Sequence, residues 1–327
     1  MEHNQWSAQT HPDIERLRET VERIKGEMQK VVVGQDEIID LLLASVFAGG
    51  HVLLEGVPGI AKTLTAKLLA RTFDCQFNRI QFTPDLMPAD VTGTTVFNVK
   101  TAEFSFHRGP IFSNIVLIDE INRSPAKTQS SLFEVMEERQ ITIDGTTHPM
   151  EYPFFVVATQ NPIEQEGTYK LPEAQLDRFL MKINLDYPSL ADEQRILRRF
   201  RDDFSQHQIQ DVNPVLTPDD LRFTQRVIEK VFIKDELLDY IANIIHSTRN
   251  HPDLFLGASP RASLAILRTS KAIAAMRGRE FVTPDDIQYV AYPVLNHRII
   301  LTPERDMEGV HTRDVIKGIV EKIEVPR

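Results

Sequence analysis

The sequence GVPGIAKT at residues 56–63 combines glycines, a lysine and a threonine at a spacing suited to binding phosphate. Apolar stretches at residues 51–54 and 64–69 flank it, which predicts a strand, a loop and a helix in that order. The backbone N–H groups of such a loop bind nucleotide phosphates at the N-terminus of the helix. Lys62 would then reach the β- and γ-phosphates, and the Thr63 hydroxyl would bind Mg²⁺.

One position of this loop departs from the usual pattern. The motif has glycine directly before the lysine, whereas this chain has Ala61. The loop alone therefore only suggests a nucleotide site, and other residues must support it. The predicted nucleotide-binding residues of the loop are Gly56, Val57, Pro58, Gly59, Ile60, Ala61, Lys62, Thr63 and Leu64.

Two consecutive acids follow a second apolar run at residues 115–118. Ligands of open α/β sheets bind at the carboxyl ends of the strands, where Asp119 and Glu120 would lie. Asp119 would position Mg²⁺, and Glu120 would act as the general base toward the attacking water. Acidic strand ends can also be merely solvated carboxylates, but their order behind a phosphate loop favours the catalytic interpretation.

Asn161 closes the next apolar run, in the sequence ATQNP at residues 158–162. At the same edge of the sheet it could orient the water against the γ-phosphate. An ordinary Asn-Pro turn is the structural alternative and, for this residue considered alone, the better interpretation.

These residues require a sheet to bring them together. Short apolar runs at residues 51–54, 77–82, 115–118, 154–158 and 181–185 alternate with helical patterns. They predict a three-layer α/β domain around a mainly parallel five-stranded sheet, with the strands at 51–54 and 115–118 in its interior. Residues 91–106 and 140–152 are predicted to be β-hairpins inserted into this core; Asp144-Gly145 is a strong turn signal.

The pattern changes beyond residue 188. A charged helix and a polar stretch precede helical segments that begin after Thr217-Pro218, Ser259-Pro260 and Thr283-Pro284. We therefore predict an N-terminal tail and helix at residues 1–30, an α/β domain at 31–188, a linker at 189–218 and a small all-α domain at 219–327.

The composition restricts the classes of function. A formal net charge of −10 over 327 residues argues against general binding to nucleic acid. A single cysteine, Cys75, allows no disulfide within the chain and favours a reducing compartment. The sequence has no signal-peptide core and no apolar run long enough to span a membrane, so a cytoplasmic location is expected.

The order of these features resembles the AAA+ ATPases, and longer motifs are similar to the MoxR family. The motifs are FTPDLMPADVTG at 82–93, GPIF at 109–112, DEINR at 119–123, ATQNP at 158–162 and LDRF at 176–179. The resemblance spans most of the chain. The resemblance also accounts for Ala61, because that family often has alanine where other phosphate loops have glycine.

The resemblance implies ATP and Mg²⁺ as cofactors and a homo-oligomeric ring, commonly a hexamer, that binds ATP between subunits. It implies the sensor-1 role for Asn161. Arg178, in the LDRF motif, matches the arginine finger that reaches the neighbour's γ-phosphate, with Arg123 as a rival. The planar N–H donors of the Arg178 guanidinium suit the negative charge that develops on the phosphate.

Two further roles follow from the resemblance. Arg261, in the sequence GASPRA at 257–262, matches the sensor-2 arginine, which would reach the phosphates of its own subunit's nucleotide. Val33 and Gly34 match the segment that borders adenine. The hairpins would face the centre of the ring or its client.

The expected function is therefore ATP-driven remodelling or maturation of a protein client. Relatives in the resembled family are associated with metal-cofactor insertion and often with a von Willebrand factor A domain partner. Two alternatives stay open: a regulatory scaffold with little ATP turnover, and a DNA-processing AAA+ protein, which the acidic composition disfavours.

Overall fold

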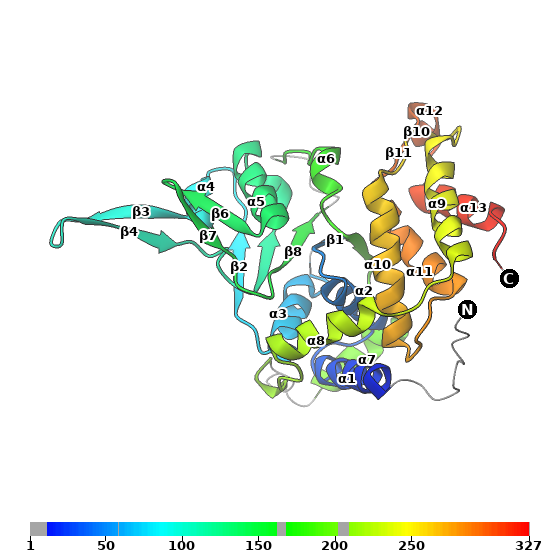
Figure 1. Cartoon of the computed structure of the whole chain (residues 1–327), viewed down its shortest axis with the longest axis horizontal. Helices are drawn as coiled ribbons and strands as arrows, with labels where there is room; N and C mark the ends of the chain where they lie inside the picture. Colours follow the sequence, from blue (N-terminus) through cyan, green and yellow to red (C-terminus); the bar gives the residue numbers. More distant parts are fainter. Residues whose placement is uncertain (1–11, 58, 162–167, 202–208, 327) are drawn as a thin grey trace, which may run out of the picture.

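The fold is taken from a computed structural model, which describes residues 12–57, 59–161, 168–201 and 209–326. Its centre is a parallel five-stranded sheet in the order β2-β5-β8-β1-β9, as predicted (Figure 1). The strands β1 and β5 are interior, with β8 between them. The five strands are β1 (Val52–Gly56), β2 (Phe77–Gln81), β5 (Ile115–Asp119), β8 (Phe155–Gln160) and β9 (Met181–Leu185).

Alternate residues of the strands pack into two separate cores, which makes the domain three-layered. Leu54 and Leu117 face a core that includes the first three helices. Leu53 and Val116 face the other core, which α4 and α5 cover. The covering helices are α1 (Pro12–Gln29), α2 (Asp36–Phe47), α3 (Lys62–Thr72), α4 (Pro88–Thr92) and α5 (Ala126–Glu138).

Both predicted hairpins are present. They consist of β3 (Gly93–Asn98) with β4 (Glu103–Arg108), and of β6 (Gln140–Ile143) with β7 (Thr146–Pro149). The first projects far from the body of the molecule (Figure 1). Neither of its strands has a buried residue, and Phe97 and Phe104 pair across it with ring centroids 4.9 Å apart. At its base, Phe106 stacks on His148 of β7 at 4.3 Å, which joins the two hairpins.

The C-terminal part is a helical lid, as predicted, with one difference. A short two-stranded antiparallel sheet, β10 with β11, lies within it because the chain between α9 and α10 pairs with the chain after α11. The lid elements are α8 (Pro218–Glu229), α9 (Asp235–Arg249), β10 (Leu254–Leu256), α10 (Pro260–Met276), α11 (Pro284–Leu295), β11 (Ile300–Leu301), α12 (Pro303–Met307) and α13 (Thr312–Lys322).

Proline marks the first residue of the helices α8, α10 and α11, as the sequence indicates. Before α8, the Thr217 hydroxyl accepts a hydrogen bond from the Asp220 N–H at 3.2 Å, and Ser259 caps α10 through the Arg261 N–H. These bonds satisfy N–H groups that a helix start leaves without partners, and proline has no such group to satisfy.

The first helix is packed into the core, and the predicted linker begins with a helix. Apolar residues of α1, such as Val21 and Ile24, are buried in the same core as residues of the lid. Within the linker, α7 (Leu190–Phe200) begins at Ser189, whose hydroxyl accepts a hydrogen bond from the Asp192 N–H. The bounds of the four predicted segments stay a prediction. In the ranges that the structure describes, no helix is both long enough and apolar enough to cross a membrane.

Candidate nucleotide-binding and catalytic site

The phosphate loop lies between β1 and α3, at the carboxyl edge of the sheet. Ala61 caps α3 in the left-handed conformation, with φ 64° and ψ 20°. Glycine adopts this conformation without strain, whereas alanine pays about 1–2 kcal/mol. The unusual residue of the motif therefore occupies the backbone geometry that glycine normally provides. The Lys62 ammonium donates to the Gly56 carbonyl at 2.7 Å, so it folds over the loop.

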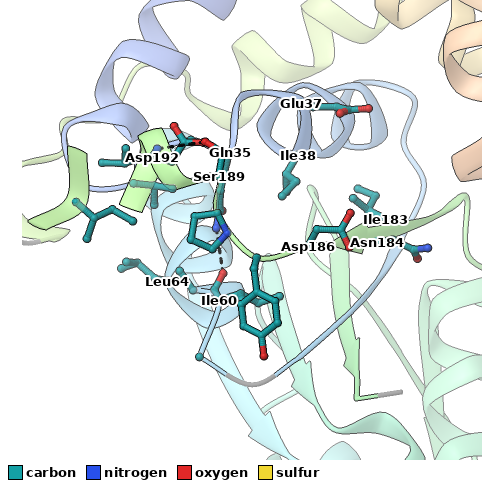
Figure 2. Close-up of a pocket in the computed structure, with 18 of the residues that line it drawn as sticks. Gln35, Glu37, Ile38, Ile60, Leu64, Ile183, Asn184, Asp186, Ser189 and Asp192 are labelled. Atoms are coloured by element: carbon teal, nitrogen blue, oxygen red, sulfur yellow. Dashed lines mark hydrogen bonds between the residues drawn. The ribbon is translucent and has the colours of Figure 1, made fainter. Parts of the chain in front are cut away.

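A cavity of about 1130 Å³ opens beside this loop (Figure 2). Six of the predicted nucleotide-binding residues line it: Val33, Gly34, Gly59, Ile60, Ala61 and Leu64. Gly56, Val57, Lys62, Thr63 and Arg261 are not among its lining residues, and Pro58 lies outside the described residues.

Gln35 ties the predicted adenine segment to the phosphate loop. Its side-chain amide donates to the Ile60 carbonyl at 3.0 Å, a bond drawn in Figure 2, and accepts from the Thr65 hydroxyl at 2.8 Å. Gly34 has φ 73°, and a Cβ there would collide with the Asp192 side chain of α7. The segment is thus held between the loop and α7, and it permits only glycine at residue 34.

The first predicted acid is buried at the end of β5. Asp119 is only 7% exposed. One carboxylate oxygen accepts from the Thr159 hydroxyl at 2.8 Å, and the other from the Thr63 hydroxyl at 3.3 Å and the Arg79 Nε at 2.7 Å. The Thr63–Asp119 contact unites the two predicted metal ligands from separate elements.

The second acid is more accessible. The Glu120 side chain is 33% exposed, and its Oε2 accepts from the Gln81 amide at 2.8 Å and pairs with Arg123 at 3.0 Å. Its backbone has φ 56°, and its N–H donates to the Thr159 hydroxyl at 3.0 Å. Thr159 therefore contacts both acids. The Asp119 side chain is enclosed, whereas the Glu120 side chain faces outward.

Asn161 follows β8 at the same edge of the sheet and is 6% exposed. Residues 162–167, which come next, lie outside the described part of the chain. The structure thus brings Asn161, Asp119 and Glu120 to the ends of neighbouring strands.

The two predicted phosphate-sensing arginines lie elsewhere. Arg178 and Arg261 both pair with Glu137 of α5, Arg261 at 2.7 Å. We call these three residues the arginine cluster. Burial, and second the nearby Arg261, lower the pKa of Arg178. The two guanidinium groups therefore share one carboxylate. The predicted contact of Arg261 with its own subunit's nucleotide stays a prediction; in this structure its guanidinium lies beside Arg178 on Glu137.

The loop that carries Arg178 also holds the lid. Asp177 accepts from the Ser259 hydroxyl at 2.9 Å and from the buried Arg298 at 2.7 Å. Since Ser259 caps α10, this link fixes where the helix that carries Arg261 begins. The preceding short helix is α6 (Glu173–Leu176).

Several functional candidates were missed by the sequence reasoning. Arg79 and Gln81 lie on β2 and contact the two acids, because β2 pairs with β5 so that Gln81 is opposite Asp119. Thr159 could have been found, since it lies within the ATQNP motif and directly precedes the end of the strand. Glu137 carried no local signal that distinguishes it from other helix-surface acids.

Comparison with known proteins identifies two matching regions. Residues 51–181 match the ATPase family associated with various cellular activities (AAA), and residues 246–319 match the AAA lid domain. The second match covers helices of the lid, and the first covers the phosphate loop, both acids and Arg178.

Similar proteins cover nearly the whole chain. "Uncharacterized protein YeaC" of Bacillus subtilis is 47% identical, over 91% of this chain and 92% of its own. "Chaperone MoxR1" of Mycobacterium tuberculosis is 42% identical, over 94% of this chain and 83% of its own. A crystal structure of a "putative ATPase" from Cytophaga hutchinsonii superposes with a TM-score of 0.88 at 44% identity, covering 96% of this chain and 97% of that one.

Proposed function

Because this chain belongs to the MoxR family of AAA+ ATPases, we propose that it hydrolyses ATP at the subunit interfaces of a ring. The observation that carries this proposal is the separation of its charges. The acids and the phosphate loop meet at one edge of the sheet, whereas Arg178 and Arg261 lie apart from them and pair with Glu137 of α5. A neighbouring subunit could then contribute the arginines that one subunit's loop lacks.

The residues present fit Mg²⁺ bound with a nucleotide. The Thr63 hydroxyl and an Asp119 oxygen lie 3.3 Å apart, and oxygen ligands from one carboxylate and one hydroxyl suit this hard cation beside phosphates. When bound, the ion would neutralise charge that develops on the phosphates. Lys62 and the N-terminus of α3 would bind the same phosphates through an ammonium and backbone N–H groups.

Glu120 would accept the proton of the attacking water. Its exposed carboxylate, held by Gln81 and Arg123, is placed outside the enclosed Asp119, so the two acids divide the base and metal-binding roles. Asn161 would orient the water from the neighbouring strand. Val33 and Gly34 would border the adenine.

Ring assembly would bring the arginine cluster to the neighbour's nucleotide. Arg178 supplies a planar, permanently charged donor for phosphate oxygens, and Arg261 lies beside it on Glu137. This placement favours a trans role for both, and gives Arg123, which pairs with Glu120 in its own chain, a different task. We propose a hexamer, by analogy with the AAA+ architecture.

The proposed client is a protein, and the proposed setting is the cytoplasm. The relative MoxR1 is named a chaperone, and a net charge of −10 disfavours nucleic acid. The exposed Phe97 and Phe104 of the projecting hairpin give the client a candidate apolar contact. A von Willebrand factor A domain protein belongs to this proposal as a partner or adaptor.

Phosphate release by the purified protein tests the catalytic part. A Glu120→Gln variant should bind ATP but lose turnover by about 10²–10⁴-fold, because it removes the general base. Glu19→Gln, at an exposed position of α1, is the matched control and should keep wild-type turnover. Equal phosphate release by wild type and Glu120→Gln would instead support a scaffold with little turnover.

A further inference from the structure

We propose that Arg313, in the first turn of α13, is the lid's contact to the phosphate chain of the nucleotide in the same subunit. This inference rests on the proposed function, since it takes the cavity beside the phosphate loop as the nucleotide site. It assigns to Arg313 the same-subunit role that the sequence suggested for Arg261.

The cavity reaches from the phosphate loop to the lid. Its wall includes Ile60 and Ala61 of the loop, Asn184 at the end of β9, Tyr292 of α11 and Arg313 of α13. Arg261 is not part of that wall. The lid thus presents one arginine to the cavity and a different one to the arginine cluster.

Charge distinguishes Arg313 from its neighbours. The cavity wall has two basic side chains, Lys182 and Arg313. Lys182 is neutralised by Glu55 at 2.8 Å, with both side chains mostly buried. Arg313 has no carboxylate within ion-pair distance among the described residues. Its guanidinium is therefore the basic group through which this wall, which also has four acidic residues (Glu37, Asp186, Asp192 and Glu193), can bind an anion.

The position of Arg313 favours phosphate over adenine. Its Cζ lies 5.3 Å from the centre of the Tyr292 ring, and the Tyr292 hydroxyl accepts from the Asn184 amide at 2.9 Å. Asn184 and the next residue of β9 pair with Glu55 and Gly56 of β1, and Gly56 begins the phosphate loop. The guanidinium is therefore supported on the wall that adjoins the loop's first residue.

The same wall fastens the lid to the sheet. Besides the Asn184–Tyr292 bond, the Asn296 amide donates to the Lys182 carbonyl at 2.9 Å. Phosphate bound by both the loop and Arg313 would thus add a link between the phosphate loop and the lid. The number of phosphates on the nucleotide would then affect how firmly α11 and α13 are held.

Calorimetric titration of the full-length protein with ATP, ADP and adenosine tests this role. Arg313→Gln should weaken ATP binding by about tenfold, since it removes a charge-assisted hydrogen bond, and leave adenosine binding unchanged. Arg313→Lys should lose less, because it keeps the charge. Lys317→Gln, one turn further along α13 and exposed, is the matched control and should bind all three ligands as wild type does.

The outcomes separate this inference from the proposed function. Unchanged ATP affinity in Arg313→Gln, or equal losses for ATP, ADP and adenosine, would overturn the phosphate contact and leave ATP binding intact. A wild-type protein that binds none of the three ligands would overturn the proposed function itself. Melting curves of each variant confirm that an affinity loss does not come from unfolding.

Discussion

The phosphate-binding edge of the sheet and the arginine cluster differ in how their charged side chains are paired. At the edge, the Asp119 carboxylate accepts hydrogen bonds from three side chains of the described residues: Thr63, Arg79 and Thr159. In the arginine cluster, Glu137 serves two guanidinium groups at once. We propose that the first region binds its nucleotide within one subunit and that the arginines of the second meet a phosphate of the neighbouring subunit.

Mixed rings test this division most strongly. Arg178→Ala alone should lose about 10³-fold in turnover, and Lys62→Ala should also be inactive. Random mixing of the two should restore about a quarter of the sites, since an intact Lys62 can then face an intact neighbouring Arg178. The measurement is phosphate release as a function of mixing ratio.

The same mixture made with Arg261→Ala separates trans from cis action. Recovery of phosphate release on mixing with Lys62→Ala would support a trans role for Arg261 beside Arg178. No recovery would mean that Arg261 contacts the nucleotide of its own subunit, so that it does not belong with Arg178 in this comparison. The control is Arg305→Ala, which replaces an exposed arginine of the lid that pairs with Asp253. This variant should hydrolyse ATP without being mixed with another.

A smaller effect is expected from the strained residue of the phosphate loop. Ala61→Gly should raise the free energy of unfolding by about 0.5–1 kcal/mol, because glycine relieves the left-handed strain but loses more chain entropy. Ala70→Gly, in the right-handed part of α3, should have the opposite sign. Thermal melting of both variants gives the shift. A lower melting temperature for Ala61→Gly would show that the edge is not strained there.

An effect of similar size concerns a histidine at the opposite end of β1. His51 is buried, accepts from the Val156 N–H at 2.9 Å, and lies 3.0 Å from the Met136 carbonyl. Burial lowers the pKa of His51 from 6.5 to about 4. The unfolded chain therefore binds a proton first as pH falls, so this contribution to stability is full above pH 6.5 and lost toward pH 4.

Between pH 8 and pH 6 this histidine should lower the free energy of unfolding by about 0.8 kcal/mol. In a His51→Asn variant that part of the pH dependence should vanish, whatever its stability at pH 8. Denaturant titrations at both pH values measure it, with His107→Asn in the exposed hairpin as control. Because the effect belongs to one subunit, it should not depend on mixing, unlike the arginine effects.

The two regions also differ in how far the sequence could predict them. The phosphate loop, Asp119 and Glu120 each occupy a short contiguous motif that ends or begins an element, so local pattern places them at one edge. Arg79 and Gln81 reach the acids only because β2 lies beside β5, and strand order is not written in a local pattern.

For Arg261, sequence identified the motif but not its surroundings. Its position depends on how Asp177 and Arg298 fasten the lid across the α/β domain, which is set by contacts between residues more than a hundred positions apart. The small sheet β10–β11 was missed for a similar reason, since its strands are short and pair across two helices.

The projecting hairpin is attached almost entirely by its base. Its strands bury no residue, their pairing is internal, and the Phe106–His148 stack joins them to the second hairpin. Gly93 and Gly109 sit where the backbone crosses so closely that a Cβ on either would collide with it. The outer portion, residues 96–104, can therefore change in length and in the apolar residues at its tip without any change in the packing of either core.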